Sequence, residues 1–280
     1  MPRRPRRGFT IASVIVLAVI GTFAAGLALP FLHVNDENAK RVQCANNLKQ
    51  IGLASLLYAN DNRGAYPRTR YEVADTLIPD VSNAGFDSAD PFAANSKVPA
   101  NCVPAAIFLL MRNEDIAAGV FVCPSTQCVP DTFGGANNSA QNRSNFTDLK
   151  ANLSYSYANP YPDTAAAAAG YDLLMRKINP AFAIAADLNP GVAGGSNVLG
   201  VSTSSTLAEM QLGNSHNHGR EGQNILYADG HVEWQNNPFA GVRRDNIYCR
   251  GKGGVTAPKS DIIDSPKDST DSVLLPTEVE

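Results

Sequence analysis

The chain has 280 residues, 44% of them hydrophobic, and its 23 basic and 26 acidic residues leave a formal net charge of −3. Without the four arginines at its start, 19 basic residues stand against 26 acidic ones, a balance of −7, and this excludes the basic surface of a nucleic-acid-binding protein. The 22 glycines and 18 prolines favour turns and strands over a helical bundle.

The chain begins with a basic segment followed by an apolar one. Four arginines lie among residues 3–7, and the 24 residues from 9 to 32 carry no charged side chain. A helix of this length, at about 1.5 Å per residue, slightly exceeds the ~30 Å hydrocarbon core of a membrane. Basic residues ahead of such a span predict that the N-terminus stays cytoplasmic and that the chain after residue 32 is exported.

Three kinds of N-terminal segment compete for this pattern. An ordinary signal peptide would be cleaved near Ala25 or Ala28, but its apolar part usually has only about 7–15 residues. A plain signal anchor would stay uncut. The third is a type IV prepilin leader, because Gly8-Phe9-Thr10 after the arginines resembles the prepilin cleavage junction. That resemblance implies cleavage between Gly8 and Phe9 and N-methylation of Phe9. Pilins usually carry glutamate at the fifth mature position, where this chain has Ser13.

Residues 38–58 continue the helix as an amphipathic segment. Apolar side chains recur at helical spacing through Leu48, Ile51 and Tyr58, and polar side chains occupy much of the opposite side. The run from Asn60 to Gly64 ends the helix. The phrase RVQCANNLKQIGLASLLYANDNRGAYP resembles a large bacterial family of pseudopilin-like proteins, in which C-NNLKQIGLAL-YA-D--G-FP follows the hydrophobic helix.

The middle of the chain predicts short elements separated by loops. Residues 105–111 are apolar enough for a packed helix, and residues 165–174 favour a second short helix. Buried strands are predicted at 120–123 and at 181–186, the latter followed by the polar Asp187, and the alternating residues 154–157 predict a further strand. The related proteins often show a similar vF-CP segment at the first of these.

Five cysteines cannot all pair within one chain. They are Cys44, Cys102, Cys123, Cys128 and Cys249. Export permits disulfides; Cys123 and Cys128 are close enough to pair, Cys102 is an alternative partner, and Cys44 is expected to be a free, packed thiol. A zinc site would favour two close cysteine pairs, and only one C-x4-C occurs, so no metal site is expected.

Asp229-Gly230 predicts a β-hairpin with a two-residue type I′ loop. In that register Tyr227 faces Val232 and Ile225 faces Trp234, so these four apolar side chains share the core face.

The same segment carries a second resemblance. The pseudopilin-like family has a histidine, nine residues and then Asp-Gly near its C-terminus, and here His218 precedes Asp229-Gly230 with ten residues between. We expect His218 to hydrogen-bond its loop to the hairpin. A metal or catalytic cluster is the competing interpretation; it would combine His216, His218, Glu221, Asp229 and His231. The turn already explains Asp229, and the chain lacks HExxH, Gly-x-Ser-x-Gly and P-loop motifs, so neither an enzyme nor a cofactor is expected.

The sequence thus predicts an α+β, pilin-like fold: a long N-terminal transmembrane helix packed on an antiparallel β-sheet, with a disordered C-terminal tail. The expected segments are a leader at 1–8, a transmembrane helix at 9–32, its amphipathic continuation at 33–60, an exported domain at 61–250 and the tail at 251–280. The resemblance implies a structural pseudopilin-like subunit of a type II secretion or type IV pilus-like assembly, single-pass in the inner membrane. Its implied partners are the bilayer, prepilin peptidase and other pilin-like subunits. The alternative is a membrane-anchored exported binding domain that does not assemble, which Ser13 favours.

Overall fold

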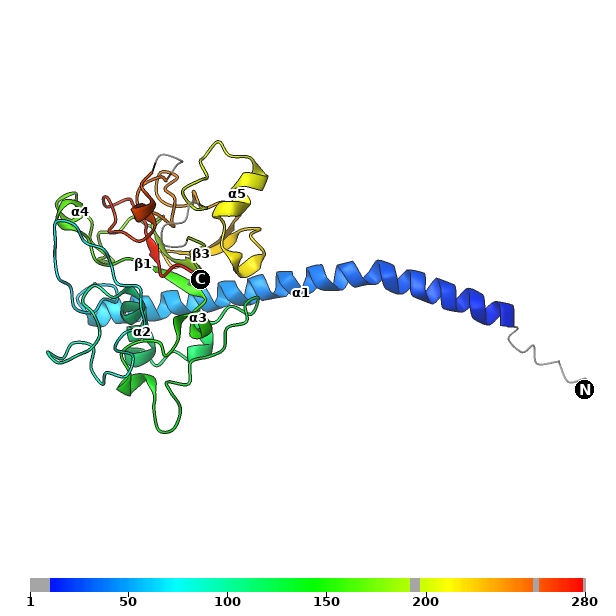
Figure 1. Ribbon diagram of the computed structural model, residues 1–280, viewed down its shortest axis with the longest axis horizontal. Helices are drawn as coiled ribbons and strands as arrows, with labels where there is room; N and C mark the ends of the chain where they lie inside the picture. Colours follow the sequence, from blue (N-terminus) through cyan, green and yellow to red (C-terminus); the bar gives the residue numbers. More distant parts are fainter. Residues whose placement is uncertain (1–10, 192–196, 254–256, 279–280) are drawn as a thin grey trace, which may run out of the picture. The chain divides into compact units, whose positions relative to one another are not determined.

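A computed structural model describes residues 11–191, 197–253 and 257–278, except for the side chains of 11–13, 17, 18, 21–35 and 259 (Figure 1). The chain divides into two compact units, one up to Lys40 and one from Arg41 onward. Helix α1 (Ile11–Asp61) contributes to both. Its end at Asp61 lies where the sequence places it.

The first unit consists of the early part of α1. Its described apolar side chains are more than half exposed: Val14, Ile15, Val16, Val19 and Ile20. Within the described residues, no helix has the length and apolar character needed to span a bilayer. Many side chains of the predicted span at 9–32, together with the cleavage-site residues Gly8 and Phe9, lie outside the described residues. The transmembrane segment and its processing therefore stay predictions.

The second unit is built on a five-stranded sheet, which confirms the α+β class. Its order is β4-β3-β2-β1-β5, and every neighbouring pair is antiparallel. The strands are β1 (Tyr155–Ala158), β2 (Ala183–Asp187), β3 (Gln223–Tyr227), β4 (Val232–Gln235) and β5 (Leu274–Leu275). The predictions of β1 and β2 are confirmed.

The last part of α1 packs against this sheet. Cys44, Leu48 and Ile51 are fully buried and recur at helical spacing, so they form the inner stripe of the helix. A Cβ on Gly52 would lie 2.7 Å from Cδ1 of Leu226 in β3. Glycine at this position therefore lets the helix approach the strand closely.

Short helices complete the domain. The predicted packed helix is confirmed as α2 (Val103–Asn113), in which Pro104 fits the first turn and the run from Val103 to Met111 is buried. The others are η1 (Ala118–Phe121), η2 (Ala140–Asn142), α3 (Leu149–Asn152), α4 (Thr164–Ala168), α5 (Leu207–Gly213), η3 (His216–His218) and η4 (Lys259–Ile262).

The predicted strand at 120–123 is wrong. Val120 and Phe121 are the last two residues of η1, and both are buried. The ring of Phe121 packs edge-on against Phe146, with centroids 5.7 Å apart. A short apolar run has no period that separates a strand from a buried turn. Here aromatic packing, rather than a sheet partner, buries it.

The hairpin exists, but its predicted register is wrong by one residue. Gly230 N–H donates to Tyr227 O at 2.9 Å, and Tyr227 N–H donates to His231 O at 2.9 Å. The loop therefore has three residues, a turn followed by Gly230 at φ +87°. Leu226 now pairs with Val232 and Asn224 with Trp234. Because side chains alternate along a strand, this shift places Trp234 beside Asn224 instead of Ile225.

The prediction of a disordered tail is also wrong for residues 257–278. Strand β5 pairs with β1 through Tyr157↔Leu275 and Ala158↔Leu274. Val273, Leu274 and Leu275 are fully buried. The polar composition of the tail pointed to disorder, but its short apolar run fills the edge of the sheet.

Candidate metal centre

Four side chains with metal-binding atoms converge inside the second unit. They are Cys44 of α1, Cys123 after η1, Asp187 at the end of β2 and His218 of η3. One ligand atom from each lies within 4.8 Å of the other three. All are buried: His218 is 2% exposed and the other three are fully enclosed. The cluster therefore lies in the core and not in a surface cleft.

The contacts in the cluster link all four side chains in a row. Cys44 Sγ donates to Asp187 Oδ1 at 2.8 Å. His218 Nε2 lies 3.5 Å from Asp187 Oδ2 and 3.6 Å from Cys123 Sγ. In a catalytic Cys-His-Asp triad the thiol and the carboxylate contact opposite ring nitrogens. Here both face Nε2, and this convergence on one nitrogen is typical of a ligand set.

Local structure explains why each side chain points inward. Cys44 belongs to the buried stripe of α1. Asp187 is held by the pairing of β2 with Tyr155 of β1. His218 sits in a single 3-10 turn that begins at the cap Ser215, whose side chain accepts from Asn217 N–H, and ends at Gly219 with φ +65°.

Hydrogen-bond donors surround the cluster. Asn224 N–H donates to Asp187 Oδ2 at 2.7 Å, and Asn217 Nδ2 donates to Asp187 Oδ1 at 3.1 Å. The hydroxyl of Tyr155 donates to Cys44 Sγ at 3.3 Å. The ring of Trp234 packs edge-on against His218, with centroids 5.5 Å apart. Negative charge on the sulfur and carboxylate atoms is thus met by donors already in place.

The pKa values of these groups separate in the folded domain. Burial raises the pKa of Cys44 well above its usual range, and Cys123 and Asp187 add to this. The hydrogen bond from Cys44 outweighs burial and, with the contact to His218, lowers the pKa of Cys123 to about 6. Burial also raises the pKa of Asp187, although His218 and the donors oppose it. Metal binding would exchange the protons of such a cluster for a cation.

Of the three predicted motif residues, His218 belongs to this cluster, and Asp229 and Gly230 do not. His218 faces Cys123 and Asp187, and its ring packs against Trp234 of the hairpin. Asp229 and Gly230 lie at the hairpin tip, where Asp229 Oδ1 is 2.5 Å from Nδ1 of the half-exposed His231.

The competing cluster of histidines and acids does not form. His216 Nδ1 pairs with Glu278 at 2.5 Å, and Glu221 pairs with Arg41. The members of that set thus have separate partners in different places.

All five cysteines, each within the described part, are free thiols. The suggested bond between Cys123 and Cys128 is absent because the two point into different surroundings. Cys123 is fully buried in the cluster, whereas Cys128 is partly exposed, with its Sγ 3.4 Å from Lys150 O. Cys102 lies elsewhere, against Asn145 Nδ2 at 3.5 Å.

Sequence reasoning missed Cys44, Cys123 and Asp187 as members of one site. Each lies in a segment that stands out in the sequence: the CANNLKQIG phrase, the VFVCP phrase and the polar end of a buried strand. His218 lies in the fourth. The signal was the presence of one ligand-type residue in each segment, rather than close spacing along the chain.

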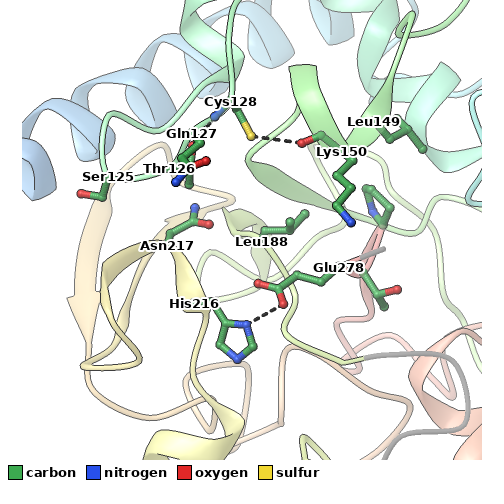
Figure 2. Close-up of a pocket in the computed structure, with 12 residues that line it drawn as sticks. Ser125, Thr126, Gln127, Cys128, Leu149, Lys150, Leu188, His216, Asn217 and Glu278 are labelled. Carbon is green, nitrogen blue, oxygen red and sulfur yellow. Dashed lines mark hydrogen bonds and ion pairs between the residues drawn. The ribbon is translucent and has the colours of Figure 1, made fainter. Parts of the chain in front are cut away.

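A surface pocket of about 330 Å³ lies next to this core (Figure 2). Figure 2 shows His216 and Glu278 paired at one side and Cys128 bonded to Lys150 at another. Asn217 belongs to both places, since it lines the pocket and donates to Asp187.

Comparison of the chain with known protein families, with curated proteins and with solved structures finds no match.

Proposed function

We propose that the chain is a membrane-anchored, pseudopilin-like structural subunit. The observation that carries this proposal is α1, a helix of 51 residues whose last part forms the core of an α+β domain with an antiparallel sheet. The N-terminal sequence gives the remaining support for this proposal. A basic leader, Gly8-Phe9 and an uncharged run of 24 residues precede the domain.

The exposed side chains of the first unit support the anchor. Val14, Ile15, Val16, Val19 and Ile20 present a surface that water disfavours. Lipid tails or the apolar helices of other subunits would cover it. In this proposal the N-terminus is cytoplasmic, the helix crosses the inner membrane once and the domain is exported.

We assign the domain a structural rather than an enzymatic role. The one cluster of reactive groups found in the described residues is buried, and its geometry lacks the opposed contacts of a triad. A minor subunit of a type II secretion or type IV pilus-like assembly would have this role.

A membrane-anchored binding domain that never assembles is the second candidate. Ser13 favours it, because the glutamate of pilins would be absent from an apolar helix bundle. The pocket beside His216 and Glu278 gives such a domain a place for a ligand.

The first test is processing in cells. N-terminal sequencing and intact mass of the mature protein should show a chain that begins with methylated Phe9. Gly8→Val should leave the precursor uncut, whereas Gly21→Val, the same change inside the helix, should be processed normally. A mature terminus near Ala25 or Ala28 would contradict the proposal and indicate an ordinary signal peptide.

The second test separates assembly from anchoring. Cysteines placed along 9–32 should crosslink to pilin-like subunits that carry the glutamate, and this chain alone should form no homopolymer. Ser13→Glu should increase crosslinking and Ser13→Ala should not. If the protein is recovered only as a monomer, under conditions where a known pilin crosslinks, the binding-domain alternative holds.

A further inference from the structure

We propose that Cys44, Cys123, Asp187 and His218 bind one Zn²⁺ ion inside the domain. This site reverses the expectation of no metal drawn from cysteine spacing. All four residues lie in the second unit. The site therefore does not depend on whether the first unit assembles with other subunits, and it is independent of the proposed function.

The geometry suits a tetrahedral ion. Zinc binds sulfur at about 2.3 Å and nitrogen or oxygen at about 2.0–2.2 Å, so its ligand atoms lie roughly 3.3–3.8 Å from each other. The contacts of His218 Nε2 to Asp187 and Cys123, at 3.5 and 3.6 Å, fall in this range. Cys44 Sγ lies 2.8 Å from Asp187 Oδ1, below this range, with the thiol as donor. We expect this distance to lengthen when the proton leaves and the ion enters.

The chemistry of the donors selects the metal. Calcium and magnesium take oxygen ligands, and this set offers two sulfur atoms, one nitrogen and one carboxylate. Thiolate with imidazole in a four-coordinate set is typical of zinc. Since all four positions come from buried protein groups, the site is closed and structural, with no open position for a reacting water.

Charge is balanced by exchange of protons for the ion. Both sulfur atoms bind the ion as thiolates; each S–H bond still present breaks as a Zn–S bond forms, and its proton passes to solvent with no change in oxidation state. Two thiolates and a carboxylate then leave one negative charge in excess of the ion. Donors from Tyr155, Asn217 and Asn224 already point at Cys44 and Asp187, and they stabilise that excess as an outer shell.

The ion would join parts of the chain that are far apart in the sequence. Cys44 and Asp187 are 143 residues apart, and the other two ligands come from loops without sheet pairing. A bound ion would fix α1 to β2 and hold the turns of η1 and η3 in place. The domain should therefore be more stable with zinc than without it.

The test uses the full chain, purified in detergent without chelators. Elemental analysis should find about one zinc per chain. Cys123→Ser and His218→Gln should lose the metal, whereas Cys128→Ser, a change at a cysteine outside the cluster, should retain it. A strong chelator should lower the melting temperature of the wild type, and added Zn²⁺ should restore it.

A second measurement does not depend on the variants folding. Co²⁺ exchanged into the wild type should give the visible bands of a tetrahedral site and a thiolate-to-cobalt charge-transfer band, and Cys128→Ser should give the same spectrum. The proposal is overturned if the wild type holds no zinc after reduction and addition of Zn²⁺. It is also overturned if the mature chain carries a Cys44–Cys123 disulfide, lighter by two hydrogens, or if copper or iron occupies the site instead.

Discussion

Two of the places where the domain buries carboxylates differ in what surrounds them. Asp187 is the only acid of its cluster, and its neighbours are two thiols, an imidazole and N–H donors. Asp245 and Asp271 are buried beside each other, and their hydrogen bonds come mainly from backbone N–H groups. The first arrangement offers soft ligands to a cation, while the second places like charges together.

The comparison teaches that burial alone does not identify a metal site. Burial and the neighbouring Asp271 raise the pKa of Asp245 to about 9, and burial raises that of Asp271 to about 6. The second place thus relieves repulsion by holding protons. The first has nitrogen and sulfur atoms that can share an ion in place of protons.

The largest effect is expected from Asp187→Ala. The change leaves Asn224 N–H and Asn217 Nδ2 without their acceptor in the core, and it removes one ligand. We expect the free energy of unfolding to fall by roughly 3–5 kcal/mol, measured by denaturant titration of the full chain in detergent. Asp187→Asn keeps an acceptor oxygen and should lose clearly less. Equal losses for the two variants would show that the acceptor oxygen kept in Asp187→Asn contributes nothing and that the charged carboxylate decides stability at this position.

The next effect is the pH dependence of stability from Asp245 and Asp271. Both have higher pKa values in the folded chain than the ordinary 3.8, so folding takes up protons. Their stabilisation is complete below about pH 4 and is lost as pH rises through 6 toward 9, at no more than about 1.4 kcal/mol per pH unit for each group.

Asp245→Asn should flatten that profile, since it removes one charge and the repulsion on the other. Asp268 adds to the repulsion and Arg250 opposes it, and both remain in the variant. The measured quantity is the difference between the wild-type and variant unfolding free energies from pH 5 to pH 8. A difference that does not change with pH would show that Asp245 stays charged throughout.

A smaller effect is expected outside both places, at the hairpin tip. Gly230 has φ +87°, and the nearest atom to an added Cβ is 3.9 Å away, so Gly230→Ala tests the backbone alone. The cost should be about 1–2 kcal/mol, equal at pH 5 and pH 8, with zinc content unchanged. A pH-dependent cost would mean that the turn is coupled to one of the buried acids.

The smallest effect is expected from Tyr155→Phe. It removes the hydroxyl that donates to Cys44 Sγ, and Asn47 Nδ2, which donates to that hydroxyl, keeps its bond to Val122 O. We expect a loss of about 1 kcal/mol in stability and a weaker hold on zinc in competition with a chelator. Unchanged competition would remove Tyr155 from the outer shell.

The sequence by itself determined the elements whose signals are local. Helical spacing predicted the inner stripe of α1, and the Asn-Asp-Asn-Arg-Gly run predicted its end at Asp61. Dense apolar runs predicted α2 and β2, and the alternation of serine and tyrosine at 154–157 predicted β1.

Tertiary structure decided whatever depends on distant partners. The extra residue in the hairpin loop reversed the face of Trp234, and β5 formed from a two-residue run that pairs with β1. The candidate site is the clearest case. Its ligands lie in four separate segments, and no spacing along the chain relates them. Packing of α1 on the sheet brings Cys44 to Asp187, and the two turns then place Cys123 and His218 beside them.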